Sequence, residues 1–453
     1  MIPRLPYFYL QLMTKPTERI HQSDILDKAY QRLIDEDEAR YCKELPDSAC
    51  HVLPGNFFLM ISATLFTKLG DALINAKTVL PWMIGALGAP VAFMAWLVPI
   101  RESGSLLPQM FIAGLIRKMP VRKWVWVGGS LGQAAAIVAM LFIVLTMDGL
   151  AGGFALITAL IVFSLARGFC SIANKDVLGK TIPKKRRGRV SGLSASAAGL
   201  ITLGVGTLLV INNDQNAEQP LLVLLICAAL MWILAPLVFA LIREKPGETD
   251  GASSFLREGI KKFALLKTDT AFRNLCISRS LLLSSALSAP YYVAIARERN
   301  DDISLLGLLM LAAGAAALIS GRFWGRLADK SSRKVLILSA TLTLLSGSGV
   351  AAINWLWVDA PAWIFVLAFF CLEVIHNGVR LGRKTYVVDM AEGNQRTDYV
   401  ATSNTLIGAI LLLTGSLGLL SHYIGAGGMV ALFAVIAGIG ALWALRLPEI
   451  GEG

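Results

Sequence analysis

Charged residues are scarce in this chain of 453 residues, of which Asp, Glu, Lys and Arg make up 16%, against roughly a quarter in ordinary soluble domains. A soluble protein of this length would need charged surfaces around two or three domains. The apolar residues instead form blocks of about twenty, such as Leu221 to Ile242, which contains no charge and matches the length that crosses a bilayer. Since lipid offers the backbone no hydrogen bonds, these blocks predict transmembrane helices.

Metal-ligating residues are also few, with four His and six Cys. Four of the Cys lie in apolar blocks, where a free Cys packs as a small apolar side chain. The other two, at positions 42 and 50, match no structural zinc pattern with the neighbouring His. The segments between the blocks contain no Walker phosphate loop, so ATP drive within this chain is unsupported. We therefore expect no metal and no cofactor.

Twelve apolar blocks predict an all-α integral membrane protein of about twelve transmembrane helices. Their approximate ranges are 56–79, 85–115, 124–147, 150–173, 190–213, 220–242, 276–297, 303–325, 335–357, 361–383, 400–424 and 427–446. Lys and Arg gather in the connections after the even-numbered blocks, and only the connection after the seventh, with Arg297 and Arg299, departs from this pattern. The positive-inside rule makes those even-numbered connections, and both termini, cytoplasmic.

The net charge of +11 follows mostly from this topology and requires no nucleic-acid partner. No organelle-targeting segment is evident, so we assign the chain to a bacterial-type inner membrane. Surrounding lipid is an expected partner, and we expect a monomer.

Two parts of the sequence repeat each other. Residues 114–123, GLIRKMPVRK, lie over residues 325–334, GRLADKSSRK, with a shift of 211. A shift of 209 superposes positions in 175–206 on positions in 384–415. These similar shifts predict two parallel six-helix halves with a substrate site between them. The predicted domains are a cytoplasmic extension (1–54), a first half (55–243), a cytoplasmic linker (244–275), a second half (276–447) and a cytoplasmic tail (448–453).

The extension contains one amphipathic segment. Apolar residues between Ile25 and Ile34 recur at helical spacing, and an acidic run follows at 35–38. We expect a cytoplasmic helix resting on the membrane domain. An acidic latch over the basic loop 184–189 is the alternative.

The segment at 325–334 resembles the loop signature of the major facilitator superfamily, G-x-L-a-D-r-x-G-r-k. The matching residues are Gly325, Leu327, Ala328, Asp329, Lys330, Arg333 and Lys334. The resemblance implies that this loop, with Gly325, Asp329, Arg333 and Lys334, adjusts the inward–outward equilibrium through a salt bridge. Ser332 replaces the second Gly, and the copy at 114–123 has Lys118 where the family usually has Asp. The subfamily stays open.

Polar residues form one stripe on the first apolar block. Thr64, Lys68, Asp71, Asn75 and Thr78 recur at steps of three and four, which places them on one helical face. Ionisable residues inside a membrane are costly and mark functional sites. We therefore predict a water-filled cavity along this face, with Lys68 and Asp71 paired. The alternative is a buried structural ion pair.

Other ionisable residues lie within later blocks. Arg101 and Glu102 are adjacent and so point to different partners, either in the cavity or in a structural network. Glu373 and His376 share a helical face and suit a proton-responsive pair better than a metal site. Arg279 either joins this pathway or reaches the membrane interface. The predicted substrate or proton pathway comprises Lys68, Asp71, Asn75, Arg101, Glu102, Arg167, Arg279, Glu373 and His376.

These features predict secondary active transport of a small solute by alternating access, coupled to protons and with unresolved direction. The excess of Lys and Arg over central carboxylates favours a substrate with an anionic group. A transporter-like sensor or lipid scramblase is one alternative. An integral membrane enzyme is another, although the charges lie near the middle of the blocks rather than in a catalytic cluster at one interface; we expect no enzyme.

Overall fold

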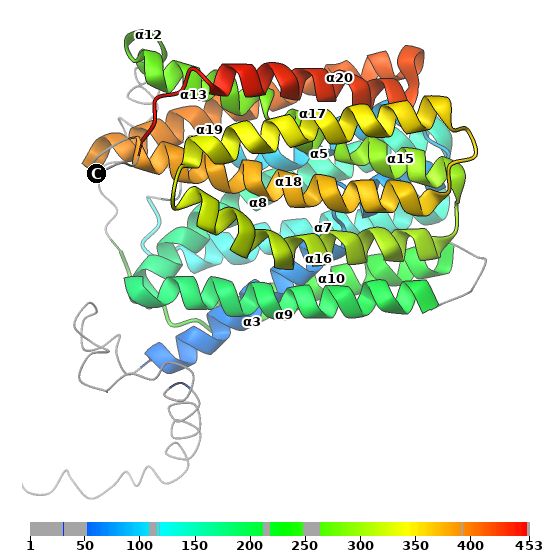
Figure 1. Ribbon diagram of the computed structural model, residues 1–453. Coiled ribbons are helices and arrows are strands. Elements are labelled where there is room, and N and C mark those ends of the chain that lie inside the picture. Colours follow the sequence, from blue (N-terminus) through cyan, green and yellow to red (C-terminus); the bar gives the residue numbers. More distant parts are fainter. Residues whose placement is uncertain are drawn as a thin grey trace, which may run out of the picture.

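The computed structural model describes residues 30, 52–107, 116, 118–211, 218–247, 263–390 and 393–450. The predicted extension falls outside this description except for Tyr30 and residues 52–54, and so do residues 248–262 of the linker. Every regular element in the described ranges is helical, and Figure 1 shows the helices side by side in one bundle. The predicted all-α fold is confirmed. We refer to residues 52–247 as the first half and to residues 263–450 as the second half.

The helices of the first half are α3 (Leu53–Leu73), α4 (Val79–Ala86), η2 (Val91–Phe93), α5 (Met94–Leu106), α7 (Lys123–Thr146), α8 (Gly149–Thr181), α9 (Lys184–Ile211) and α10 (Glu218–Ala240). Those of the second half are α12 (Leu265–Thr268), α13 (Thr270–Leu281), α14 (Ser284–Leu287), α15 (Ala289–Arg299), α16 (Ile303–Ala328), α17 (Ser332–Leu356), α18 (Ala362–Asp389), α19 (Gly393–Gly415), η3 (Ser416–Leu420) and α20 (Ser421–Ala444).

Eight helical stretches in the described residues are long and apolar enough to cross a membrane. One of them, Thr402–Ala444, contains the positive-φ residue Gly425, which lies between the two spans predicted at 400–424 and 427–446. Large apolar side chains such as Leu208 and Leu241 are exposed on the outside of the bundle, where lipid covers them. The chain is a multi-pass membrane protein.

The first predicted span is interrupted, and the connection predicted at 80–84 is wrong. After α3 the chain turns at residues 74–78 and re-enters a helix as α4. The Asn75 side chain accepts a hydrogen bond from the Lys77 backbone N–H at 2.8 Å, which competes with helical bonding at this point. Residues 80–84 are buried within α4, and the turn follows at residues 87–90.

The seventh predicted span is interrupted as well. It consists of α13, α14 and α15, with breaks near Leu282 and Ser288 and Pro290 in the first turn of α15. The interruptions therefore fall in the first crossing segment of each half. Broken helices at corresponding positions of two repeats are typical of transporter binding sites.

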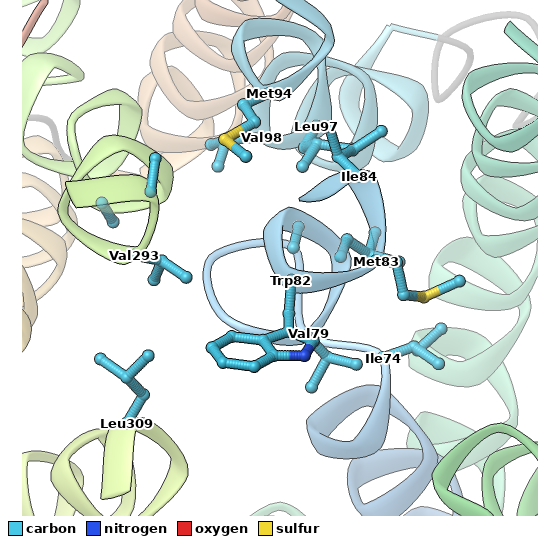
Figure 2. Packing of buried hydrophobic residues seen from close by; sticks show 14 of the residues in the cluster. Ile74, Val79, Trp82, Met83, Ile84, Met94, Leu97, Val98, Val293 and Leu309 are labelled. Atoms are coloured by element: carbon cyan, nitrogen blue, oxygen red, sulfur yellow. The ribbon is translucent and has the colours of Figure 1, made fainter. Parts of the chain in front are cut away.

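The two halves meet closely near one end of the bundle, which we call the far end. This end contains the turn at residues 87–90, where Leu87 O accepts a hydrogen bond of 2.7 Å from Gly149 N. Figure 2 shows Trp82 of α4 beside Val293 and Leu309 of the second half, all three of them buried. Arg297 Nη1 also donates to Trp82 O at 3.2 Å. Apolar packing thus closes the far end.

The other end, which we call the basic end, contains the loops that follow α8 and α16. Buried Tyr30 of the extension packs there edge-on against Phe57, with 5.1 Å between ring centroids. The Arg186 guanidinium donates to the Tyr30 hydroxyl and lies 5.2 Å from the ring centroid. Tyr30 of the extension therefore contacts Arg186, and the segment 184–189, predicted as a basic loop, forms the first turns of α9. The helix and latch predictions for the remaining residues lie outside the described ranges.

Glu244 organises the basic end of the first half. Its fully buried side chain accepts hydrogen bonds from the backbone N–H groups of Arg122 at 3.0 Å and Lys123 at 2.7 Å, where α7 begins. It also pairs with Lys180 at 2.9 Å. A carboxylate at a helix N-terminus satisfies free N–H donors and complements the helix dipole.

Glu449 has a related role at the end of the second half. It accepts from Ser331 Oγ and pairs with Arg333 at 3.4 Å, while its side chain remains 32% exposed. A carboxylate beyond the last helix thus holds the repeated loop in each half. The exact domain boundaries stay a prediction.

We expect Glu244→Gln to destabilise the protein by about 2–3 kcal/mol, because it leaves Lys180 and one buried N–H with weaker partners. Glu449→Gln should change stability by less than about 1 kcal/mol, since its ion pair is partly solvated. Thermal unfolding of the two purified variants and the unaltered protein in the same detergent measures the difference. Equal effects would contradict a special role for Glu244.

Candidate functional site

A polar cavity of about 540 Å³ lies where the two halves meet. The interrupted first crossing of the first half supplies part of its wall, and α5, α8, α18 and α19 supply the rest. Its ionisable lining residues are Asp71, Lys77, Arg101, Glu102, Arg167, Lys175, Glu373 and Arg380. Five of these side chains are cationic and three are carboxylates, so the cavity has an excess of two positive charges.

Asp71 is the centre of a three-residue network. Its Oδ1 atom lies 2.7 Å from Arg101 Nη2, and its Oδ2 atom lies 2.5 Å from Arg167 Nη1. The three residues belong to α3, α5 and α8, so one carboxylate ties three helices together. The Arg101 guanidinium also lies 5.0 Å from the ring centroid of Phe163, a cation–π contact that holds it in place.

The predicted pairing of Lys68 with Asp71 is wrong. Lys68 Nζ donates instead to Ser191 O of α9 at 3.2 Å. The two residues share a helical face, but the arginines of α5 and α8 approach the carboxylate from other helices and offer planar, multidentate donors. Helical spacing places residues on one face and does not say which neighbours cross to meet them.

Lys77 joins the two halves across the cavity. Its Nζ atom lies 2.8 Å from Glu373 Oε1 of α18, and both side chains are mostly buried. Lys77 reaches this position because the chain leaves the helix at residues 74–78. Asn75, in the same turn, lines the cavity as predicted.

The predicted pairing of Glu373 with His376 is also wrong. Glu373 is occupied by Lys77, whereas His376 Nδ1 lies 2.9 Å from Ser285 Oγ. Ser285 lies in the interrupted seventh crossing, so His376 ties α18 to α14 as Arg167 ties α8 to α3. Arg167 and His376 are 209 residues apart, which is the shift of the repeat, so residues of different chemistry join corresponding helices in the two halves.

Arg279 lies behind the cavity wall. Its guanidinium donates to Ser403 Oγ at 2.6 Å and to Asn404 Oδ1 at 3.2 Å, and only 6% of the residue is exposed. It therefore fastens α13 to α19 through Asn404, which itself lines the cavity.

Glu102 points into the cavity and is exposed there. Within the described part of the chain it forms no ion pair, because Arg101 is held by Asp71. The prediction that the adjacent residues Arg101 and Glu102 have different surroundings agrees with this arrangement.

A second cavity of about 560 Å³ adjoins the first between α3, α9, α16 and α18. Asp71, Asn75 and Arg380 line both cavities, and Lys68 and Thr78 line the second. Four residues of the polar stripe predicted on the first block thus line the two cavities, and Thr64 lines neither. The described residues include no cluster of three His, Cys, Asp or Glu that could hold a metal ion.

The sequence reasoning missed six polar residues of the cavity: Lys77, Ser105, Ser171, Lys175, Arg380 and Asn404. One signal was available, since Glu373 and Arg380 are seven residues apart and so share a helical face. Lys77 was hidden by the assumption of a continuous first helix. Lys175 was read only as a topological charge.

Residues of the predicted conformational loop lie at the basic end. Arg333 donates to Leu445 O at 2.7 Å in addition to its contact with Glu449, and the Lys334 N–H donates to Ser331 Oγ at 3.1 Å. Gly325 lies in the last turn of α16, and Asp329 caps that helix with its side chain exposed. Among the described residues, Asp329 has no ion-pair partner in this state.

A family model described as the Major Facilitator Superfamily matches residues 280–452. No curated protein matches the sequence. The fold is similar to that of a POT family transporter in complex with 5-aminolevulinic acid, with a TM-score of 0.68 at 11% identity over 86% of this chain and 95% of the other.

Two further solved structures are similar. For a D-xylose-proton symporter the TM-score is 0.66 at 11% identity, over 86% of this chain and 98% of that one. For the inward open xylose transporter from E. coli the TM-score is 0.65 at 10% identity, over 88% of this chain and 97% of that one. At these identities the similarity shows a shared fold and leaves the substrate open.

The observed network predicts which charges are coupled. A double-mutant cycle with Asp71→Leu and Arg101→Met should give a coupling free energy of about 1–3 kcal/mol, because each single change strands a partly buried charge. The matched cycle with Asp71→Leu and Lys68→Met should give less than about 0.5 kcal/mol. Thermal unfolding of all single and double variants measures both values. A larger coupling for Lys68 would contradict the network.

Proposed function

We propose that this chain belongs to the major facilitator superfamily and is a proton-coupled secondary transporter that moves a small anionic solute by alternating access. The observation that carries this proposal is the cationic cavity between the two halves. It has the size of a small-molecule site, and charged residues are retained inside a membrane chiefly where they serve ions or substrates.

The arginine pair supports an anionic substrate. Arg101 and Arg167 both bind the carboxylate of Asp71, so two guanidinium groups converge at one point of the cavity. Guanidinium groups bind carboxylates and phosphates through planar, charge-assisted hydrogen bonds. With the excess of two positive charges, the cavity balances best when it holds an anion.

Glu102 is our proposed proton carrier. The carboxylates of Asp71 and Glu373 are held in ion pairs with Arg101, Arg167 and Lys77. Glu102 is exposed to the same cavity, and among the described residues none forms an ion pair with it, although the charges of Arg101 and Arg380 act on it. A proton on Glu102 would remove one negative charge next to the arginines and so favour the entry of an anion.

Alternating access requires two states. In the observed state the halves pack together at the far end, as Trp82 and Arg297 show, and Lys77 and Glu373 form an ion pair across the cavity. We propose that this state is open toward the basic end, and that this end is cytoplasmic in a bacterial-type inner membrane. In the other state the basic end closes and the far end separates.

We expect Glu102→Gln to abolish the pH dependence of solute flux in proteoliposomes that carry a proton gradient. Asp71→Asn and Glu373→Gln should reduce flux through weaker structure and binding while they leave its pH dependence in place. Glu298→Gln is the control, because this carboxyl is exposed and lies outside the cavity. Unaltered pH dependence in Glu102→Gln would exclude Glu102 as the carrier.

We expect Asp329→Asn to shift the population toward the observed state. In this state Asp329 is exposed without an ion pair, whereas the family resemblance implies a salt bridge in the alternative one, so only the alternative state loses an interaction. Labelling of single Cys reporters at the far end should decrease at least severalfold. Labelling that does not change would show that Asp329 takes no part in the equilibrium.

A further inference from the structure

A third cavity lies at the side of the bundle and has a different chemistry. It has a volume of about 830 Å³ and lies between α5, α8 and α19. Its wall is apolar and aromatic, with Phe93, Trp96, Ile100, Phe154, Ile161 and Leu412. We call it the lateral chamber. Its few polar lining groups are the hydroxyls of Ser103, Ser164 and Thr405.

The lateral chamber is reached from the hydrocarbon region of the membrane. Phe154, Ile161 and Leu165 of α8 form part of its wall and present an exposed apolar surface. That surface belongs to one of the long apolar helices of the bundle, so lipid lies against it. An apolar group can therefore enter the chamber sideways without crossing water.

The lateral chamber is next to the cationic cavity. Ser164 of the chamber precedes Arg167 of the cavity by three residues on α8, and Gly104 follows Arg101 by three on α5. Residues three apart lie on the same side of a helix. Both arginines that hold Asp71 thus stand one helical turn from the chamber.

Neighbouring residues of α5 and α19 line the two cavities. At the end of α5, Leu106 lines the cationic cavity and Leu107 lines the lateral chamber. On α19, Asn404 lines the cationic cavity and Thr405 lines the lateral chamber. The partition is the contact of α5 with Gly408 of α19, where an added Cβ would lie 3.0 Å from Leu107 Cγ. A shift of α19 against α5 would join the two spaces.

We propose that the substrate is an anionic amphiphile with a single apolar tail, whose head binds at Arg101 and Arg167 and whose tail occupies the lateral chamber. This inference rests on the proposed transport function and names its substrate class. Charge complementarity selects the anionic head, and the apolar wall selects the tail. Ser164 Oγ is buried on the chamber wall, and no described residue forms a hydrogen bond with it, so it can bind a polar atom near the head.

Chain-length dependence of binding tests the proposal. The full-length protein in nanodiscs is titrated with butyrate, octanoate and dodecanoate, and with alkyl monophosphates of the same lengths, and binding to empty nanodiscs is subtracted. Affinity should rise about fourfold for each added methylene until the chamber is full, since burying a methylene contributes about 0.8 kcal/mol. The two headgroup series show whether a carboxylate or a phosphate is preferred. Dodecanol, which lacks the anion, should bind at least tenfold more weakly than dodecanoate.

Two matched pairs of variants separate the chamber from general lipid contact. Ile161 is 41% exposed and lines the chamber, whereas its neighbour Val162 is 48% exposed and does not. Ile161→Trp should flatten the chain-length dependence, and Val162→Trp should leave it unchanged. Leu412→Trp and Leu413→Trp form a second pair on α19, in case one variant fails to fold.

Arg167→Gln should weaken all chain lengths at least tenfold without altering the slope. If short anions bound and affinity did not depend on chain length, the substrate would not be an amphiphile, while the proposed transport of an anionic solute would be unaffected. If Ile161→Trp and Val162→Trp reduced the chain-length dependence of affinity equally, the lateral chamber would not be the binding site of the tail. Chain-length-dependent binding without any gradient-driven flux would uphold the amphiphile as ligand while the proposed transport function fails.

Discussion

Three transmembrane helices meet at one carboxylate. Asp71 of α3 lies between Arg101 of α5 and Arg167 of α8. In this region a charge without ion-pair partners is poorly solvated, and two arginines stabilise the carboxylate better than one. The network holds the first half together at the depth of the cavity, and it aims two guanidinium groups at the same point. The cationic cavity, the adjacent lateral chamber and the proposed anion site all depend on it.

Interrupted helices provide the remaining geometry. The turn at residues 74–78 brings Lys77 across to Glu373, and the breaks in α13–α15 bring Ser285 to His376. A continuous helix would keep these side chains at fixed angular steps of about 100°. The two interruptions therefore let the first crossing of each half contact a later helix, and in the first half this contact reaches the opposite half.

The two ends of the bundle have different physical character. The far end is held by apolar packing around Trp82, which is dry and dense. The basic end is held by charged contacts such as those of Glu244 and Glu449, which water and salt weaken more readily when they are partly exposed. The equilibrium between the two transport states can therefore be shifted by changes in apolar packing at the far end and by changes in charge at the basic end.

The sequence by itself determined the membrane class, the all-α fold and most span positions, because bilayer thickness and backbone hydrogen bonding allow few alternatives to an uncharged stretch of about twenty residues. It also identified the residues of the Asp71 network, since charges inside apolar blocks stand out. Only the tertiary structure decided their partners. Lys68 forms a hydrogen bond with Ser191, Glu373 forms an ion pair with Lys77, and His376 forms a hydrogen bond with Ser285. Each partner belongs to a helix distant in the sequence or to a helix break, and hydrophobic periodicity reveals neither. Helical spacing specifies the direction in which a side chain leaves its own helix axis. Which residue it pairs with depends on which neighbouring helices lie within reach of that side chain.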